Sequence, residues 1–276
     1  MSRFYLIWLL CCAALLLSGC GPSAAPAGPL PALSLIGMGL GLGDLVGYFL
    51  PDGSWVARTG EEIARRVEAY LKEIAAGYAK EIRFDLGRVW GPRLLESAYP
   101  VIREQGFKVV AILSPGKEPP VGEIKLEEDI AWLRVALPKV KEDCLAFEFW
   151  NEPANPKIGN TELAVPDPPT YIAWHNAIAK VVRELAPGLP ILGPSVMGKW
   201  SWAWWEAVRD LIDYDIVNSH LYGAGDLYGP SDKPTWVTEA GNMSYWRPWH
   251  AKYFLYVWNS AGDQWAKRPG GGILPG

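Results

Sequence analysis

Two glutamates follow apolar segments and could carry acid–base or nucleophilic chemistry. Asn151 and Glu152 come directly after the apolar run 145–150 and before a proline, which cannot continue a strand. Glu239 follows a second apolar run, 235–238, and precedes two small residues. Two carboxyl groups that face one cleft can supply a general acid and a nucleophile on either side of a glycosidic bond. The two segments therefore predict a catalytic pair, provided that the fold brings their ends together.

The chain around these glutamates alternates short apolar segments with amphipathic ones. The apolar runs have no polar alternation, as in a parallel sheet that helices cover on the outside. We expect strands at 33–38, 81–86, 107–113, 145–150, 190–193, 215–219 and 235–238. Apolar periodicity with cap and stop residues predicts helices at 61–76, 93–105, 126–140, 169–186 and 201–211.

This alternation covers about 245 residues and fits one α/β domain, a (β/α)8 TIM barrel, better than two domains. A doubly wound open sheet is the alternative. Residues 221–233 show no helical period, so the sixth helix is expected to be short or missing. A seventh helix at 247–261 would leave only 262–276 for a weak eighth strand. The eighth β/α unit is then either abbreviated, or the chain stops before completing it.

The segment Trp-Asn-Glu-Pro at 150–153, taken with Glu239, resembles the catalytic residues of clan A retaining glycoside hydrolases. That clan includes family 5 cellulases and mannanases and family 39 xylosidases. In it an Asn-Glu pair ends the fourth strand and a second Glu ends the seventh, the strands to which our count assigns Glu152 and Glu239. The resemblance covers roughly 33–261 and implies retention, with Glu239 as nucleophile and Glu152 as acid/base. It also implies that Asn151 binds the sugar 2-OH.

Further residues match the pattern of the clan. Arg83 ends the second strand, where the clan has an arginine close to the nucleophile. His220 and Tyr222 follow the sixth strand, where the histidine of the clan lines the donor-sugar site and its tyrosine donates to the nucleophile. Ser114 stands where family 5 enzymes have a histidine after the third strand. This departure leaves the single family open.

The two glutamates are expected to differ in protonation. Glu239, near Arg83, should remain ionised, whereas its negative charge should raise the pKa of Glu152 and keep that carboxyl protonated. Glu148 has the same strand parity as Glu152, and we expect it to be a buried structural carboxylate with a partner. Asp85 shares the parity of Arg83 and could serve either the site or the structure.

Tryptophan is abundant, at 15 of 276 residues, and its ring suits both sugar stacking and core packing. Trp90 follows the second strand and Trp246 the seventh, so both are expected on loops where they can stack on sugar rings. Trp246 or Trp265 could replace the eighth-strand tryptophan of the clan. Trp202 fits a sugar platform or a structural role equally well. Aromatic residues on several loops favour endo action on a β-linked oligo- or polysaccharide.

The first residues have the anatomy of a targeting segment. The apolar run 4–17 is too short for a bilayer core of about 30 Å and predicts a signal peptide at 1–19. It ends in Leu-Ser-Gly-Cys, which resembles the lipobox of bacterial lipoproteins and implies a lipidated Cys20. A proline-rich linker would occupy 20–31, and the glycoside hydrolase domain 32–276. The chain is then exported and anchored to the bacterial cell envelope, unless an ordinary secretory signal is cut nearby.

Composition argues against several other classes. With 30 acidic and 26 basic residues the chain has no basic excess for nucleic acid. The glycine-rich stretch 37–43 does not complete a nucleotide-binding motif, and three scattered histidines form no metal motif. We therefore expect neither cofactor nor metal. Two alternatives remain open: a glycan-binding lipoprotein on a degenerate barrel that lacks catalysis, and a transglycosylase.

Overall fold

The computed structural model describes residues 36–40, 46–49, 55–75, 80–115, 124–155, 157–158, 161–162, 165–196, 198, 201–222, 231–240 and 250–258. Cys20, Trp246, Trp265 and the expected signal peptide and linker lie outside these residues. Among the helices of the described ranges, none combines the length and the apolar character that a membrane span needs.

Eight strands form one parallel sheet in the order β10-β11-β12-β1-β4-β5-β6-β9. Their bounds are β1 Ile36–Leu40, β4 Glu81–Asp85, β5 Lys108–Leu113, β6 Cys144–Phe149, β9 Ile191–Leu192, β10 Val217–Leu221, β11 Thr235–Ala240 and β12 His250–Trp258. Except for β9 and β10, which stand at the two ends of this order, each strand pairs with the next strand of this sheet along the chain, and the last pairs with the first. A doubly wound sheet would reverse its order part-way, and the observed order shows no such reversal.

The strands at the two ends of this order are also linked to each other. Isolated parallel bridges join Leu192 to Ile216 and Val196 to Ser219. Two short antiparallel hairpins, which sequence periodicity did not predict, lie in the connections: β2 (Gly47–Phe49) with β3 (Trp55–Ala57), and β7 (Lys157–Ile158) with β8 (Thr161–Glu162).

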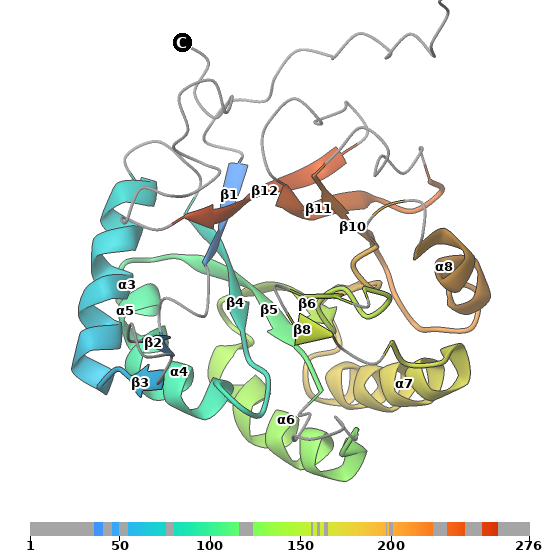
Figure 1. The fold of residues 1–276 in the computed structure, drawn as a ribbon, viewed down its shortest axis with the longest axis horizontal. Coiled ribbons are helices and arrows are strands. Elements are labelled where there is room, and N and C mark those ends of the chain that lie inside the picture. The colour runs from blue at the N-terminus through green and yellow to red at the C-terminus, as the bar shows by residue number, and fades with distance from the viewer. Residues whose placement is uncertain are drawn as a thin grey trace, which may run out of the picture.

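Helices surround part of this sheet (Figure 1). They are α3 Gly60–Ala75, α4 Gly91–Ser97, α5 Tyr99–Glu104, α6 Leu126–Val140, α7 Pro168–Leu185 and α8 Trp202–Val208. The single helix expected at 93–105 is in fact two, because Pro100 lies in the first turn of α5 and has no N–H to continue the ladder of α4. Within the described ranges no helix follows α8, and 223–230, where a sixth helix would fall, lies outside them.

The helix expected at 247–261 is wrong, because His250–Trp258 form β12. This strand pairs in parallel with both β1 and β11. Its second half reads Tyr-Phe-Leu-Tyr-Val-Trp, and aromatic and β-branched residues favour strands. Periodicity alone does not separate a short apolar helix from a buried strand. The eighth strand of the described sheet thus comes from this segment, and 262–276 lie outside the described residues.

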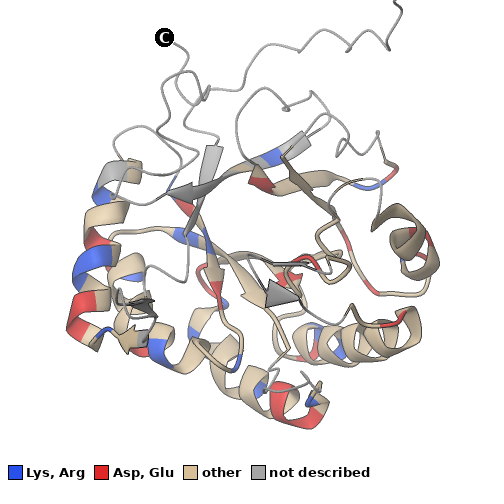
Figure 2. Ribbon diagram, viewed as in Figure 1, with Lys and Arg blue, Asp and Glu red and all other residues tan. Residues whose placement is uncertain are grey.

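The sheet has an apolar outer face and an inner face that changes character along the strands. Outside, apolar residues pack between the strands and the helices. Inside, a smaller apolar cluster consists of Val110, Ala146, Leu192, Ile216, Trp236 and Phe254. Glu148, Asn218 and Thr238 are buried polar residues. They lie two positions after Ala146, Ile216 and Trp236, respectively. Because side chains alternate along a strand, the carboxyl end of the inner face is polar. Figure 2 shows charged residues on these central strands as well as on the outer helices.

Candidate active site

The structure brings Glu152 and Glu239 together. Glu152 follows β6, the fourth strand of the main sheet in chain order, and Glu239 lies in β11, the seventh. One carboxylate oxygen of each glutamate and one ring nitrogen of His220 all lie within 4.8 Å of one another. All three side chains are buried. The prediction that the two carboxyl groups face one space is therefore confirmed in geometry.

A turn with unusual backbone angles presents Glu152. Trp150 and Glu152 adopt φ values of 67° and 47°, a left-handed region that costs free energy for residues other than glycine. The buried Trp150 ring is held edge-on by Trp174, with 5.5 Å between ring centroids. The backbone N–H of Glu152 donates to Ser195 Oγ over 2.6 Å. These contacts stabilise the turn at the carboxyl end of β6.

Arg83 links three acceptors at the centre of the site. Its Nε and Nη2 donate to the two oxygens of Glu148 over 2.8 and 2.6 Å. Nη1 donates to Glu239 Oε2 over 2.8 Å, and Nη2 also donates to Asn151 Oδ1 over 2.6 Å. Burial would raise the pKa of Glu148, but the charge and hydrogen bonds of Arg83, aided by His220, lower it to about 2. Glu148 is thus the buried, paired carboxylate that its parity predicted.

Both oxygens of Glu239 receive a hydrogen bond. Arg83 contacts Oε2, and the Tyr222 hydroxyl donates to Oε1. Charge-assisted hydrogen bonds of this kind stabilise a negative carboxylate. The side chain is therefore held in one orientation with its charge compensated.

Glu152 has different partners. His220 Nδ1 lies 2.7 Å from its Oε1, and Asn155 Nδ2 donates to its Oε2 over 2.7 Å. The sequence analysis did not identify Asn155. A polar residue three positions after Glu152 is a signal that could have been used.

The expected protonation of Glu152 is wrong for the site without substrate. Burial raises its pKa, but the hydrogen bond and positive charge of His220 outweigh burial, so the net pKa is lowered. The pKa of His220 is raised to about 9, because Glu239, Glu148 and Glu152 together outweigh its burial. These two shifts favour a proton on His220 over one on Glu152, and the charge of Glu239 alone does not reveal this effect.

The same three side chains offer oxygen and nitrogen atoms that divalent metals can bind. A cation placed among them would have to displace the proton between His220 and Glu152 and lie near the guanidinium of Arg83, which already contacts Glu239. The local positive charges therefore make this group a poor fit for a metal centre.

Other predicted residues lie around the same end of the sheet. Trp90, in the loop after β4, is 36% exposed at the start of α4. Ser114 follows β5 and accepts the Asn151 N–H over 3.5 Å. Burial raises the pKa of Asp85 to about 6, against the opposing effects of the Gly87 N–H and Arg83. Asp85 accepts that N–H and so holds the loop after β4.

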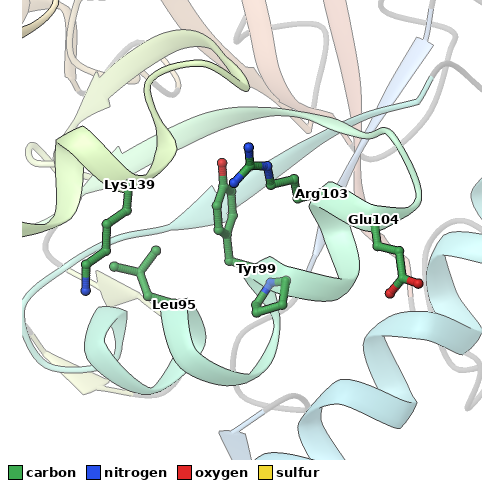
Figure 3. A pocket seen from close by; sticks show the side chains of 6 residues that line it. Leu95, Tyr99, Arg103, Glu104 and Lys139 are labelled. Carbon is green, nitrogen blue, oxygen red and sulfur yellow. The ribbon is translucent and has the colours of Figure 1, made fainter.

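A separate cavity of about 560 Å³ lies outside the sheet between α4, α5 and α6 (Figure 3). It is lined by Leu95, Tyr99, Pro100, Arg103, Glu104 and Lys139. The Tyr99 hydroxyl donates to Asp143 over 2.8 Å, beside the start of β6. This places the cavity toward the amino ends of the strands, and none of the predicted site residues lines it.

No protein-family model and no curated protein matches the chain. Solved structures do. The chain is similar to a calcium-binding mutant of Bacteroides uniformis beta-glucuronidase 2, with a TM-score of 0.50 and 14% identity, over 76% of this chain and 25% of that one. It is also similar to a glucosidase from Croceicoccus marinus, with a TM-score of 0.49 and 12% identity over 90% of this chain and 65% of that one.

A third similar structure is an endoglucanase from Pseudomonas stutzeri in complex with cellobiose, with a TM-score of 0.47 and 13% identity. That match covers 75% of this chain and 74% of the endoglucanase. The chain thus spans about two thirds of the glucosidase and a quarter of the glucuronidase. At these identities the likeness is one of fold, and the fold of this chain is a parallel α/β fold similar to part of the glucuronidase.

Proposed function

We propose that the chain is a retaining glycoside hydrolase that cleaves O-glycosidic bonds in a β-linked glycan by double displacement. The observation that carries this proposal is the approach of Glu152 and Glu239 oxygens to within 4.8 Å. Retaining enzymes place their two carboxyl groups about 5–5.5 Å apart, whereas inverting enzymes need about 6.5–9.5 Å to admit a water molecule. The short separation supports direct attack by one glutamate.

Glu239 is the nucleophile in this proposal. Arg83 and Tyr222 orient it and stabilise its charge before attack. Asn151 uses Oδ1 to accept from Arg83, so its Nδ2 group is directed elsewhere and can donate to the sugar 2-OH. Arg83 therefore positions both the nucleophile and the sugar-binding amide.

Glu152 is the acid/base. In the first step an oxygen of Glu239 bonds to the anomeric carbon, the bond to the leaving oxygen breaks, and Glu152 gives that oxygen a proton. In the second step Glu152 takes a proton from water, the water oxygen bonds to the anomeric carbon, and the ester bond to Glu239 breaks. The proton for the first step comes from the His220–Glu152 pair.

The finer features are also proposals. We propose that the eight strands close into a (β/α)8 barrel at the two bridges between the β9 and β10 regions. We propose endo action, supported by the tryptophans of several loops, and stacking of sugar rings on Trp90 and Trp246. Export and a lipid anchor at Cys20 rest on the leader sequence.

A substrate panel tests the proposed function. Chains beginning after Cys20 are assayed on aryl β-glycosides and on dyed β-glucan, xylan and mannan, as wild type, Glu152→Gln and Glu239→Gln. Glu184→Gln is the matched control, because Glu184 is an exposed partner of Arg134. We expect turnover by wild type and control, a β-anomer as the first product by proton NMR, and loss of turnover in both site variants.

Three outcomes would contradict this proposal. An α-anomer as the first product would exclude retention. Equal inactivity of all four proteins, with glycan binding retained, would favour the binding lipoprotein. Transfer to an added sugar in place of hydrolysis would favour the transglycosylase.

A further inference from the structure

A β-bulge directs two consecutive residues of β11 into the site. Ser219 pairs with Val237 and His220 pairs with Glu239, which leaves Thr238 as an extra residue in β11. Regular alternation would point Thr238 and Glu239 to opposite faces of the sheet. With the bulge, Thr238 contacts His220 while Glu239 contacts Arg83.

Thr238 belongs to a buried chain of hydrogen bonds. Its hydroxyl donates to Asn218 Oδ1 over 2.7 Å, and its Oγ1 lies 3.2 Å from His220 Nε2. A threonine hydroxyl has one hydrogen, and here Asn218 receives it. Towards the histidine, Oγ1 can therefore only accept, which requires a proton on Nε2.

Charge around the ring favours the same arrangement. Nε2 lies 3.8 Å from Glu148 Oε1, and a protonated nitrogen is attracted to this carboxylate while a bare nitrogen lone pair is repelled. On the other side Nδ1 faces Glu152 at 2.7 Å and Glu239 at 3.6 Å. Arg83 is the cation that faces the ring and opposes its protonation.

We propose that Thr238 and Asn218 are positioning residues that keep a proton on His220 Nε2, so that Nδ1 and Glu152 Oε1 share one further proton. That proton has two places. On Nδ1 it gives an imidazolium beside a carboxylate, and on Oε1 it gives a neutral imidazole beside a carboxylic acid. Transfer of this proton between Nδ1 and Oε1 does not change the protonation of any other group. The raised pKa of His220 favours the first arrangement before substrate binds.

In catalysis this pair would store the acid proton that Glu152 delivers, a role that rests on the proposed function. The tautomer itself does not depend on turnover. If Thr238 could not accept, a neutral ring with its proton on Nδ1 would satisfy Glu152 and leave Nε2 bare. Nε2 would then lose its proton at a lower pH than in wild type.

Nitrogen-15 NMR of histidine-labelled protein tests the inference without any ligand. The chain has three histidines, and His220→Asn assigns the relevant signals. For wild type we expect a protonated Nε2 at every pH at which the protein is folded. Thr238→Val should lower the pH at which Nε2 takes the signal of an unprotonated nitrogen, whereas Thr238→Ser, which keeps the hydroxyl, should retain the wild-type behaviour. Unchanged His175 signals show that the variants are folded.

Two results would overturn the inference. One is an unprotonated Nε2 in wild type near neutral pH, as when the Asn218 amide is turned and Thr238 donates to the ring. The other is a folded Thr238→Val protein whose Nε2 keeps its proton to as high a pH as in wild type. The wild-type spectrum alone tests whether Nε2 is protonated, even if the valine variant does not fold. An inactive protein with a protonated Nε2 would reject the proposed function and leave this inference standing.

Kinetics provide a readout that a structural role would not move. With phenyl and dinitrophenyl glycosides of the sugar found in the panel, Thr238→Val should lower kcat/KM about ten-fold for the phenyl glycoside, whose leaving group needs a proton. The dinitrophenyl glycoside needs no acid, so its kcat/KM should change less than about two-fold. Equal losses on both would show that Thr238 does not act through the acid proton.

Discussion

Arg83 donates to Glu239 across 2.8 Å while its other nitrogens are committed to Glu148 and Asn151. One guanidinium thus forms ion pairs with two buried carboxylates that come from different strands. The carboxylate of Glu148 lies behind Arg83 and fixes the plane of the guanidinium. The orientation of Glu239 consequently depends on a residue that Glu239 does not itself contact.

Replacing Arg83 by Met should destabilise the protein strongly. Both carboxylates would remain buried without their cation, and breaking such a pair costs about 3–5 kcal/mol. Urea unfolding at neutral pH measures the loss. Arg134→Met is the control, since Arg134 and Glu184 are about half exposed and such pairs contribute only about 0–1 kcal/mol. Similar losses in both variants would show that Arg83 is not the central cation of the site.

Tyr222→Phe should reduce turnover without unfolding the chain. The hydroxyl donates to Glu239, and a hydrogen bond to a charged group contributes about 1.5–3 kcal/mol. If that contribution is made to the reacting carboxylate, kcat/KM should fall about 10- to 100-fold. Tyr99→Phe removes a comparable hydroxyl from the outer cavity and should leave kcat/KM unchanged. A Tyr222→Phe enzyme as fast as wild type would remove Tyr222 from the mechanism.

Asn155→Ala should move the alkaline limb of the pH profile upward. The amide hydrogen bond is one cause of the lowered pKa of Glu152, so its removal raises that pKa. The acid form then persists to higher pH. A net hydrogen bond of about 1 kcal/mol corresponds to a displacement of about 0.7 pH units in kcat/KM. Asn176→Ala is the control, because this side chain of α7 binds the backbone of Leu211 and Asp213 away from the site. A downward displacement in Asn155→Ala would contradict the assignment.

The buried His175 should make the fold sensitive to acid. Its ring nitrogens contact the Tyr171 hydroxyl at 3.0 Å and the Asp213 carbonyl oxygen at 2.8 Å. Burial lowers its pKa from 6.5 to about 4, although the Asp213 carbonyl opposes this. The unfolded chain therefore binds a proton that the folded chain refuses between these two pH values. This contribution to stability is complete above pH 6.5 and is lost as pH falls towards 4.

Urea unfolding between pH 7 and 4 measures this effect, which should amount to about 3 kcal/mol for wild type. His175→Phe should be less stable at pH 7, because its polar partners lose their contacts. Its stability should nevertheless decline less over the same pH range. A decline equal to that of wild type would assign the acid sensitivity to other groups.

The sequence predicted the convergence of the site residues because it depends on local signals. Glu152 and Glu239 each stand at or near the end of an apolar run, Arg83 lies within another, and parallel strands bring their carboxyl ends to one edge. The helix expected at 126–140 has the observed bounds for a similar reason, since its periodicity is regular. Residue types and strand order were thus enough to gather these side chains.

The features that the sequence analysis missed depend on contacts between residues that are far apart in the chain. Thr238 was expected to be an ordinary strand residue, and only its register against β10 reveals the bulge. The proton on His220 depends on three carboxylates from separate segments, which no local pattern encodes. The strand at His250–Trp258 is stabilised by two neighbouring strands that periodicity does not see.

The sheet that carries the site can be completed only after β12, its last strand in chain order, has been synthesised. Met38, from the first strand, pairs with Leu255, from the last, and such remote pairing makes folding slow. A nascent chain that has just produced Glu239 already contains both glutamates, but β11 still lacks one neighbour and presents an open edge that invites aggregation. Premature termination before this strand should therefore yield inclusion bodies and not a slower enzyme.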